Sequence, residues 1–295
     1  MAPVGTVENT SASGSPGGSA PARVGVCSWS LRPATTAALV SAVEATGLGA
    51  VQLALEPLRS GAMEPAATQA ALAAAGIAVP SAMLAFPGED YSTLESIRRT
   101  GGVVPDAAWP RNLQAAQAAA GIAAEFRVGL VTFHAGFIPH TASDPMRRVV
   151  LDRILTIAEP FLARSIPVAL ETGQENAATL LEALDALQED RIGVNFDPAN
   201  MVLYGMGDPV HALELLAPRV LQVHLKDALP AVREGSWGTE VPAGDGAVDW
   251  TAFFAVMERH LPGLGVMIER ESGESRIEDI RQAAGLASHF LGGLA

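Results

Sequence analysis

The chain has 295 residues, of which 49% are hydrophobic and 17% charged, and its formal net charge is −13. This length and apolar content allow a large core, and barrels of alternating strands and helices reach this size as one domain. The acidic balance disfavours nucleic acid as a partner, because its recognition depends on neutralising phosphates.

The first 22 residues are rich in Ser, Gly, Pro and Ala. We predict a disordered, flexible tail over residues 1–22, followed by one catalytic domain over residues 23–295. The tail has no basic segment leading into an apolar one, unlike a secretory signal. No apolar run approaches the roughly 18 residues that span a membrane, so no membrane partner is expected. Cys27 is the single cysteine, which excludes an intramolecular disulfide and favours a cytoplasmic location.

Eight strand-like runs alternate with eight segments of helical composition after the tail. Most runs are continuously apolar, which is typical of parallel strands covered on both faces. The predicted strands cover residues 24–28, 50–55, 77–85, 129–134, 166–171, 192–197, 220–225 and 265–269. The predicted helices cover residues 35–45, 64–75, 107–124, 144–163, 176–188, 208–216, 249–260 and 274–290. This alternation predicts an α/β fold, a (β/α)8 TIM barrel. Cys27 is expected to be a small buried residue of the first strand rather than a nucleophile.

An open, doubly wound sheet is the rival architecture. Its first strand would normally lead into a Gly-rich turn, and here residues 28–33 read Ser-Trp-Ser-Leu-Arg-Pro. Two connections of the predicted barrel are long, over residues 86–106 and 226–248. Both follow the C-terminal end of a strand, where barrel enzymes build their substrate loops.

Four successive predicted strands carry a metal-ligand type of residue at or near their ends. These residues are Glu171, Asp197, His224 and Glu269. Strands five to eight are neighbours in a barrel, so the four side chains are expected to converge. Each alone could be an unrelated polar residue at a strand end, but four in succession favour a metal site. Three carboxylates and one imidazole favour Mn²⁺, with Mg²⁺ or Co²⁺ tolerated, over a thiolate-type zinc site.

Such a site suits removal of a proton from the carbon next to a carbonyl, through an enediolate whose charge the metal holds. Glu171 and Glu269 lie on the outer two of the four strands, so one could remove the proton and the other return it. Return to the opposite face gives epimerisation, and return to the adjacent carbon gives aldose–ketose isomerisation. A lyase is the alternative, because loss of a β-hydroxyl or of the aglycone of a 3-keto-glycoside could follow the same first step.

The segments around the four residues resemble the sugar phosphate isomerase/epimerase family of the xylose-isomerase-like TIM barrel superfamily. They read ETGQE at 171–175, NFDPAN at 195–200, VHLKD at 223–227 and IERE at 268–271. The resemblance covers about residues 23–292. It implies that Glu171, Asp197, His224 and Glu269 bind the metal and that the two glutamates form the acid/base pair. Many epimerases have a histidine where this chain has Asn200, which can hydrogen-bond but cannot shuttle protons.

Further residues are candidates for contact with the substrate, a small keto sugar or polyol. They are Trp29, His134, Glu175, Asn200, Lys226 and Trp237. Simpler roles are open for several of them: His134 could bond to backbone, Lys226 could pair with Asp227 or a rim carboxylate, and Glu175 could cap the helix near residue 176. The tryptophans could belong to ordinary packing. Glu271 could replace Glu269 as the ligand, because the two share a strand face.

The superfamily also includes AP endonucleases, which use a trinuclear zinc site with several more histidines. This chain has six histidines, and His211 and His260 fall in predicted helices, away from the strand ends. The shortage of histidines and the negative charge argue against DNA cleavage. A barrel that binds a sugar without catalysis is a further alternative, although the complete ligand set opposes it. The sequence leaves open whether the chain forms a homo-oligomer.

Overall fold

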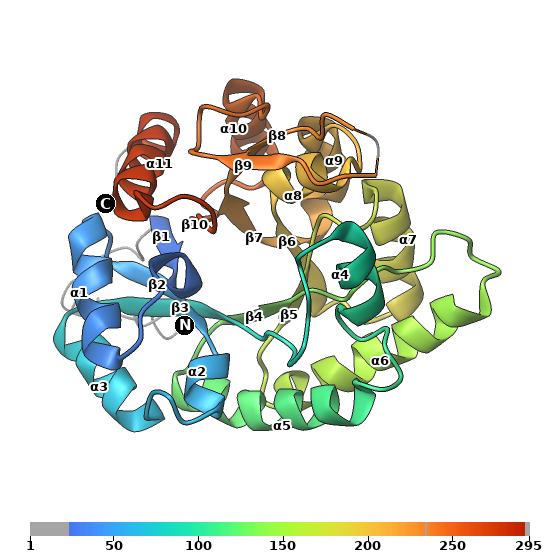
Figure 1. Cartoon of the computed structure of the whole chain (residues 1–295), viewed down its shortest axis with the longest axis horizontal. Coiled ribbons are helices and arrows are strands. Elements are labelled where there is room, and N and C mark those ends of the chain that lie inside the picture. The colour runs from blue at the N-terminus through green and yellow to red at the C-terminus, as the bar shows by residue number, and fades with distance from the viewer. Residues whose placement is uncertain (1–23, 234, 293–295) are drawn as a thin grey trace, which may run out of the picture.

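Eight parallel strands close into a barrel in the computed structural model, which describes residues 24–233 and 235–292 (Figure 1). The strand order around the barrel is β1-β10-β7-β6-β5-β4-β3-β2. The strands are β1 (Val24–Cys27), β2 (Ala50–Ala54), β3 (Ala78–Met83), β4 (Leu130–Phe133), β5 (Val168–Glu171), β6 (Ile192–Phe196), β7 (Val220–Leu225) and β10 (Val266–Ile268). The predicted (β/α)8 architecture is confirmed, whereas the predicted tail over residues 1–22 lies outside the described residues.

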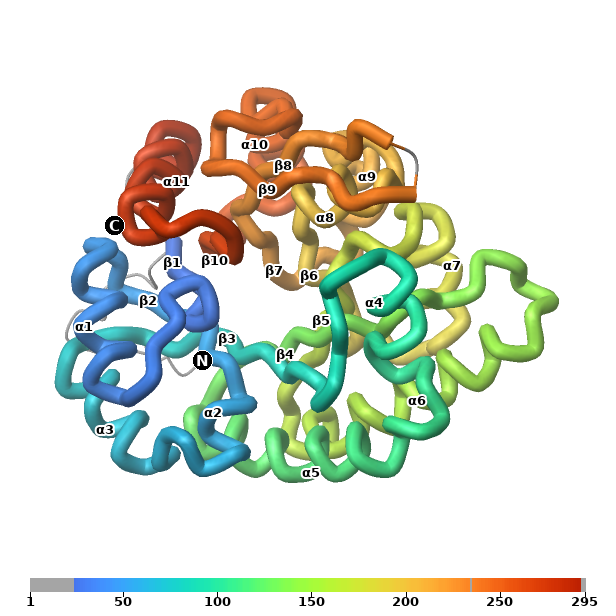
Figure 2. The backbone as a smooth tube through the Cα atoms, viewed as in Figure 1, coloured from blue at the N-terminus to red at the C-terminus, as the bar shows by residue number. Residues whose placement is uncertain are grey.

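A ring of helices surrounds the barrel (Figure 2). The helices that correspond to the predicted segments are α1 (Thr36–Thr46), α3 (Pro65–Ala74), α5 (Trp109–Glu125), α6 (Pro145–Leu162), α7 (Ala177–Leu187), α9 (Pro209–Leu216), α10 (Trp250–His260) and α11 (Arg276–Leu291). Their starts follow from local chemistry. Asp144 and Asp208 accept backbone N–H bonds at the starts of α6 and α9, and a proline follows each of them. No helix in the described part of the chain is long and apolar enough to cross a membrane.

Several short elements were not predicted. They are the 3₁₀ turns η1 (Ser28–Leu31) and η2 (Ala217–Arg219), the helices α2 (Glu56–Arg59), α4 (Leu94–Thr100) and α8 (Pro198–Tyr204), and the strands β8 (Asp227–Leu229) and β9 (Thr239–Val241). Helix α4 lies within the long connection after β3. Strands β8 and β9 form an antiparallel hairpin within the long connection after β7. Both connections lie at the end of the barrel that faces the viewer in Figure 1.

The two faces of the strands differ in character, as β6 illustrates. Phe196 points outward and packs against Phe253 of α10, with 5.9 Å between the ring centroids. Its neighbour Asn195 points into the barrel and bonds to other buried side chains. Gln52 and Thr132 on β2 and β4 are likewise polar and fully buried. Because unpaired polar groups are costly to bury, such an interior indicates a polar site inside the barrel.

Candidate active site

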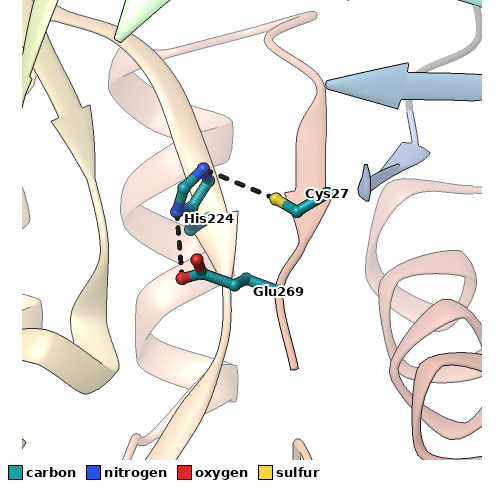
Figure 3. A group of neighbouring side chains, drawn as sticks. All are labelled: Cys27, His224 and Glu269. Carbon is teal, nitrogen blue, oxygen red and sulfur yellow. Dashed lines mark hydrogen bonds and ion pairs between the residues drawn. The ribbon is translucent and has the colours of Figure 1, made fainter. Parts of the chain in front are cut away.

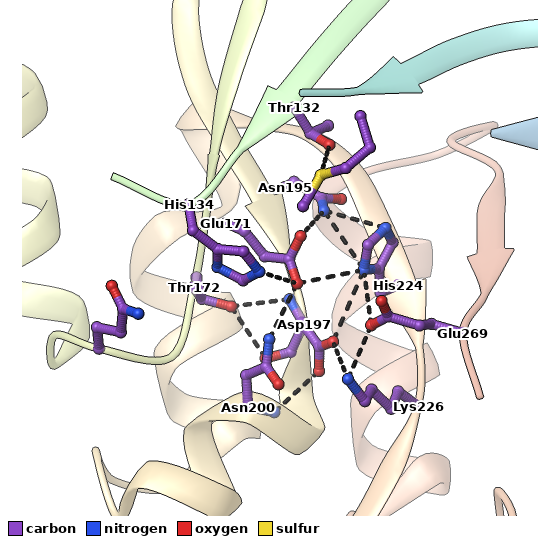
Figure 4. Close-up of polar contacts among 12 residues, drawn as sticks. Thr132, His134, Glu171, Thr172, Asn195, Asp197, Asn200, His224, Lys226 and Glu269 are labelled. Carbon is purple, nitrogen blue, oxygen red and sulfur yellow. Dashed lines mark hydrogen bonds and ion pairs between the residues drawn. The ribbon is translucent and has the colours of Figure 1, made fainter. Parts of the chain in front are cut away.

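The four expected ligand residues converge inside the barrel (Figure 4). Glu171 is the last residue of β5, His224 lies within β7, and Asp197 and Glu269 directly follow β6 and β10. One ligand atom from each lies within 4.8 Å of those of the other three, and all four residues are buried. Glu269 rather than Glu271 belongs to this group. Neighbouring parallel strands therefore bring together residues that are far apart in the sequence.

His224 lies at the centre of the group. Its Nδ1 is 3.6 Å from a Glu171 oxygen, 3.7 Å from Asp197 and 3.3 Å from Glu269. Its Nε2 is 2.8 Å from Oε1 of Gln52. The amide nitrogen of Gln52 donates to Thr132, so the amide oxygen faces the ring. In the neutral imidazole Nε2 therefore carries the proton, and Nδ1 presents a lone pair to the carboxylates.

Asp197 uses its two carboxylate oxygens differently. Oδ1 accepts the backbone N–H of Asn200 at 2.9 Å and caps α8. Oδ2 is buried and has no hydrogen-bond partner. The backbone of Asp197 is fixed on both sides by the hydroxyl of Thr172. A buried carboxylate oxygen without a donor is unfavourable, and a cation between the four residues would give it a partner.

The two glutamates are held by donors from different elements. Asn200 and Asn195 donate to the two oxygens of Glu171 at 2.9 and 3.0 Å. The indole N–H of Trp29 donates to one oxygen of Glu269 at 2.5 Å, and Lys226 donates to the other at 3.0 Å. Both carboxylates thus have a fixed orientation toward the centre of the barrel.

Burial and mutual charge shift the pKa values of the group. Burial raises the pKa of Asp197 to about 7. Burial acts in the same direction on Glu171 and Glu269, but the nearby His134, His224 and Lys226 outweigh it. The pKa of Glu171 is therefore lowered, and that of Glu269 is held well below its usual value. Burial opposes a charge on His224, yet the surrounding acidic groups hold its pKa well above its usual value. Protons on Asp197 and His224 thus balance the clustered carboxylates when no cation is bound.

A second potential ligand group, Cys27 with His224 and Glu269, adjoins the first (Figure 3). The thiol of Cys27 lies 3.7 Å from Nε2 of His224 and 3.4 Å from Oε1 of Gln52. Burial raises the pKa of the Cys27 thiol to about 12. The thiol faces Nε2 of His224, whereas the carboxylates of the first group face Nδ1, so Cys27 is not part of that group. Cys27 is fully buried in β1, as the sequence predicted.

The donor set therefore consists of oxygens and one nitrogen. Hard divalent cations such as Mn²⁺ and Mg²⁺ prefer such donors, and thiolate is absent from the set. Together with the unpartnered oxygen of Asp197, this chemistry fits a divalent cation held by Glu171, Asp197, His224 and Glu269.

A cavity of about 540 Å³ opens above the group at the C-terminal ends of the strands. Of the residues predicted to contact a substrate or a metal, those that line it are Trp29, His134, Asn200, Lys226, Trp237 and Glu269. Five polar or aromatic lining residues were not predicted from the sequence, and these are Glu89, Tyr91, Tyr204, Glu240 and Ser272. Three of them lie in the two long connections, so their location was predicted, although their identity was not.

Glu175, His134 and Lys226 were predicted to contact the substrate, and the structure shows what each of them contacts within the protein. Glu175 does not line the cavity: it accepts the backbone N–H of Ile138 at 2.6 Å, and burial raises its pKa to about 8. Asn176, and not Glu175, caps α7. His134 lies 3.6 Å from Glu171. Lys226 pairs with Glu269 and, at 2.6 Å, with Glu271, so the alternative of a rim salt bridge is present.

Similar folds occur among solved structures. A xylose isomerase domain protein from Planctomyces limnophilus has a TM-score of 0.79 and 29% identity, over 86% of this chain and 93% of that one. A probable 3-DHS dehydratase from Bacillus anthracis has a TM-score of 0.68 and 15% identity, over 90% and 98%. A 3-keto-D-glucoside 4-epimerase from E. coli has a TM-score of 0.67 and 15% identity, over 90% and 99%.

The dehydratase and the epimerase are too distant in sequence to show more than a shared fold. No curated protein matches the chain. The model of the xylose isomerase-like TIM barrel family, however, matches residues 40–288, which is most of the chain. The chain belongs to the xylose isomerase-like TIM barrel family.

Proposed function

We propose that the protein is a divalent-metal-dependent isomerase or epimerase that acts on a keto sugar or a related polyol. The observation that carries the proposal is the buried group of Glu171, Asp197, His224 and Glu269, with an unpartnered oxygen on Asp197, directly below the cavity. Membership of the xylose isomerase-like family supports a sugar as substrate. The similar fold of a 3-keto-D-glucoside 4-epimerase is consistent with this class of reaction.

The proposed cation is Mn²⁺, with Mg²⁺ or Co²⁺ as substitutes, held by the four residues of the group. When bound, such a cation polarises a carbonyl and supplies positive charge for the oxygen that becomes negative as the adjacent proton leaves. The remaining roles fall to side chains. Lys226 and Asn200 line the cavity beside the group, so their N–H groups can hold hydroxyl or carbonyl oxygens of the sugar.

Glu171 and Glu269 are the proposed proton carriers. Both carboxylates stay ionised near neutral pH, because neighbouring cationic groups lower their pKa values. A carboxylate in this state can accept a carbon-bound proton from a substrate placed above it. The two side chains reach the group from β5 and from the end of β10, with β6 and β7 between them. They therefore approach a bound sugar from different sides, as removal and return of a proton require.

The proposal is tested by proton exchange with solvent. A panel of ketoses, inososes and 3-keto-glycosides is incubated in D₂O with Mn²⁺ and followed by NMR. We expect deuterium at one carbon of the substrate or of its epimer or isomer. Glu171→Gln and Glu269→Gln should reduce exchange by about 100-fold or more, in line with general base catalysis. His211→Ala, an exposed helix residue, is the control and should exchange at the wild-type rate.

Two outcomes would redirect the proposal. A new double bond with loss of water or of an aglycone would make the protein a lyase, the runner-up that shares the first step. A wild-type protein that binds no divalent cation at micromolar concentrations would overturn the metal-dependent mechanism itself.

A further inference from the structure

Part of the cavity lining is apolar and aromatic, in contrast to the charged residues that line the rest of it. Tyr204 at the end of α8 and Trp237 in the β8–β9 connection both line it. Their rings meet edge to face, with 4.7 Å between centroids and 67° between planes. Leu203 lines the cavity next to them. We call Tyr204 and Trp237 the aromatic ledge.

The aromatic ledge is held in place by contacts that do not involve a ligand. The backbone N–H of Gly238 donates to the carbonyl of Leu203 and ties the hairpin connection to α8. A Cβ at Gly238 would lie 2.5 Å from the carbonyl oxygen of Leu229, so only glycine permits this approach. Gln174 donates to the Tyr204 hydroxyl, and the ring of Phe137 packs on Tyr204 at 5.9 Å. A rigid apolar surface of this kind loses little conformational entropy when it binds a ligand.

The size of the cavity exceeds what a single sugar ring needs. Its volume of about 540 Å³ falls within the range of roughly 300–1,000 Å³ that is typical of sites for drug-sized ligands. A monosaccharide whose carbonyl lies above Glu171 and Glu269 occupies one part of this cavity, and the aromatic ledge lines another part. A substituent on the sugar can fill that region and bury its apolar surface.

The charges around the cavity oppose an anionic substituent. Four glutamates line it, which are Glu89, Glu240, Glu269 and Glu271. Lys226 is the sole lysine or arginine among the described lining residues, and it is already paired with Glu269 and Glu271. His134, a further basic residue of the lining, lies 3.6 Å from Glu171. Among the described lining residues, a phosphate or carboxylate on the substrate would therefore meet basic side chains that already pair with glutamates, and repulsion from the glutamates would disfavour it.

The aromatic ledge itself presents two polar groups, fewer than the hydroxyls of a second sugar ring. The Tyr204 hydroxyl accepts a bond from Gln174 and keeps its own proton to donate, and the indole nitrogen of Trp237 is buried without a hydrogen-bond partner. Hydroxyl groups buried there without partners would lose the hydrogen bonds that they make to water. An aromatic ring has no such loss and gains edge-to-face or stacked contacts with the two rings.

We propose that the substrate is an uncharged keto glycoside with an aromatic aglycone that packs on the aromatic ledge. This inference rests on the proposed function, because that function places the reacting sugar above Glu171 and Glu269. It adds a specificity element: Tyr204 and Trp237 select aryl glycosides over free sugars, oligosaccharides and sugar phosphates.

Binding of stable glycosides tests the inference without requiring turnover. Full-length protein with Mn²⁺ is titrated calorimetrically with phenyl glucoside (both anomers), methyl glucoside, cellobiose and glucose 6-phosphate. We expect one phenyl anomer to bind at least tenfold more tightly than the other three ligands, about 1.4 kcal/mol. Trp237→Ala should reduce the phenyl-to-methyl ratio below about threefold, since the aromatic contact contributes most of it. Val232→Ala is the matched control on the same connection, because Val232 is almost fully exposed and does not line the cavity.

The inference fails if cellobiose or glucose 6-phosphate binds as tightly as the phenyl glucosides, if phenyl and methyl glucosides bind equally, or if Trp237→Ala keeps the wild-type ratio. Absence of saturable phenyl glucoside binding at millimolar concentrations also overturns it. The outcome is separable from that of the proposed function. Metal binding and deuterium exchange into a ketose with no phenyl preference would refute the ledge alone, whereas a phenyl preference without exchange would refute the reaction alone.

Discussion

His224 lies between Gln52 on one side of its ring and three carboxylates on the other, so Gln52 should influence the proposed metal site. Gln52 accepts from Nε2 and is itself oriented by Thr132, so Nδ1 is the nitrogen that faces the carboxylates and must give up its proton when a cation binds. Partners behind a metal-bound histidine typically change metal affinity by 10- to 100-fold. We expect Gln52→Leu to weaken Mn²⁺ binding by about that factor in calorimetric titrations. Gln52→Glu keeps an acceptor oxygen at this place and should restore most of the affinity. Wild-type affinity in Gln52→Leu would show that the ring needs no such partner.

The raised pKa values of Asp197 and His224 predict how metal affinity depends on pH. Below pH about 7 Asp197 carries a proton, and His224 keeps its proton above its usual pKa. A cation must displace these protons, so binding weakens as pH falls and strengthens as pH rises. Each displaced proton changes the affinity by roughly tenfold per pH unit. Calorimetry from about pH 8 to about pH 6, in buffers of different ionisation enthalpy, measures affinity and proton release together. A constant affinity over this interval would contradict the assignment.

For single residues, the sequence indicated candidate site residues where the residue type is unusual for its position. A carboxylate or imidazole at the end of an apolar strand stands out, and the four that do so converge. Gln52 did not stand out, because a single polar residue in a short apolar run does not reveal which face is buried. Glu175 shows the opposite difficulty. It lies four residues after Glu171, yet its side chain bonds to the backbone of Ile138 instead of lining the cavity. Side-chain direction in a loop depends on tertiary contacts that the local sequence does not contain.

Asp227 organises the long connection between β7 and α10. Its carboxylate is buried and accepts hydrogen bonds from five N–H groups. They belong to Ala228, Gly244, Gly246, Val248 and the indole of Trp250. A carboxylate with this many donors adds to the backbone pairing of β8 and β9 and fixes the residues that follow the hairpin. The hairpin that carries Trp237 and Glu240 therefore depends on one side chain at its base.

Asp227→Ala should consequently destabilise the protein and loosen this connection. Buried donors left without an acceptor cost about 1–3 kcal/mol each when water cannot replace it, so we expect a loss of about 3 kcal/mol or more in free energy of unfolding. Urea denaturation measures the loss, and limited proteolysis should cleave within residues 227–249. Asp245→Ala is the control, because Asp245 is exposed on the same connection. Equal stability of the two variants would refute the role of Asp227.

The elements that the sequence predicted and those that it missed differ in what stabilises them. The eight barrel strands and their surrounding helices follow long apolar or periodic patterns, and their observed bounds lie within a few residues of the prediction. Helix α8 has seven residues, and strands β8 and β9 have three each. Segments this short have little intrinsic stability. Asp197 caps α8, Asp227 anchors the hairpin, and α8 packs against β8 and β9, a tertiary contact that the local sequence does not reveal.

At the scale of the whole molecule, the four proposed metal ligands join half of the barrel. Its residues come from β5, β6, β7 and β10, which are consecutive around the sheet. Without a cation, three buried carboxylates share a small volume and must be balanced by protons. A cation that binds only the folded chain adds stability according to its concentration relative to Kd. The same residues that are proposed to perform the chemistry should therefore also control the thermal stability of the protein.

We expect Mn²⁺ at a hundredfold excess over Kd to stabilise the fold by about 2.7 kcal/mol, and a chelator to remove that gain. For a chain of this length the difference corresponds to a shift in Tm of about 4 °C. Differential scanning calorimetry with and without chelator measures it. In His224→Ala the shift should disappear, because the central ligand is lost, whereas His211→Ala, on an exposed face of α9, should keep the full shift. A shift that persists in His224→Ala would mean that the stabilising cation binds elsewhere on the acidic surface, and the proposed metal centre would have to be abandoned.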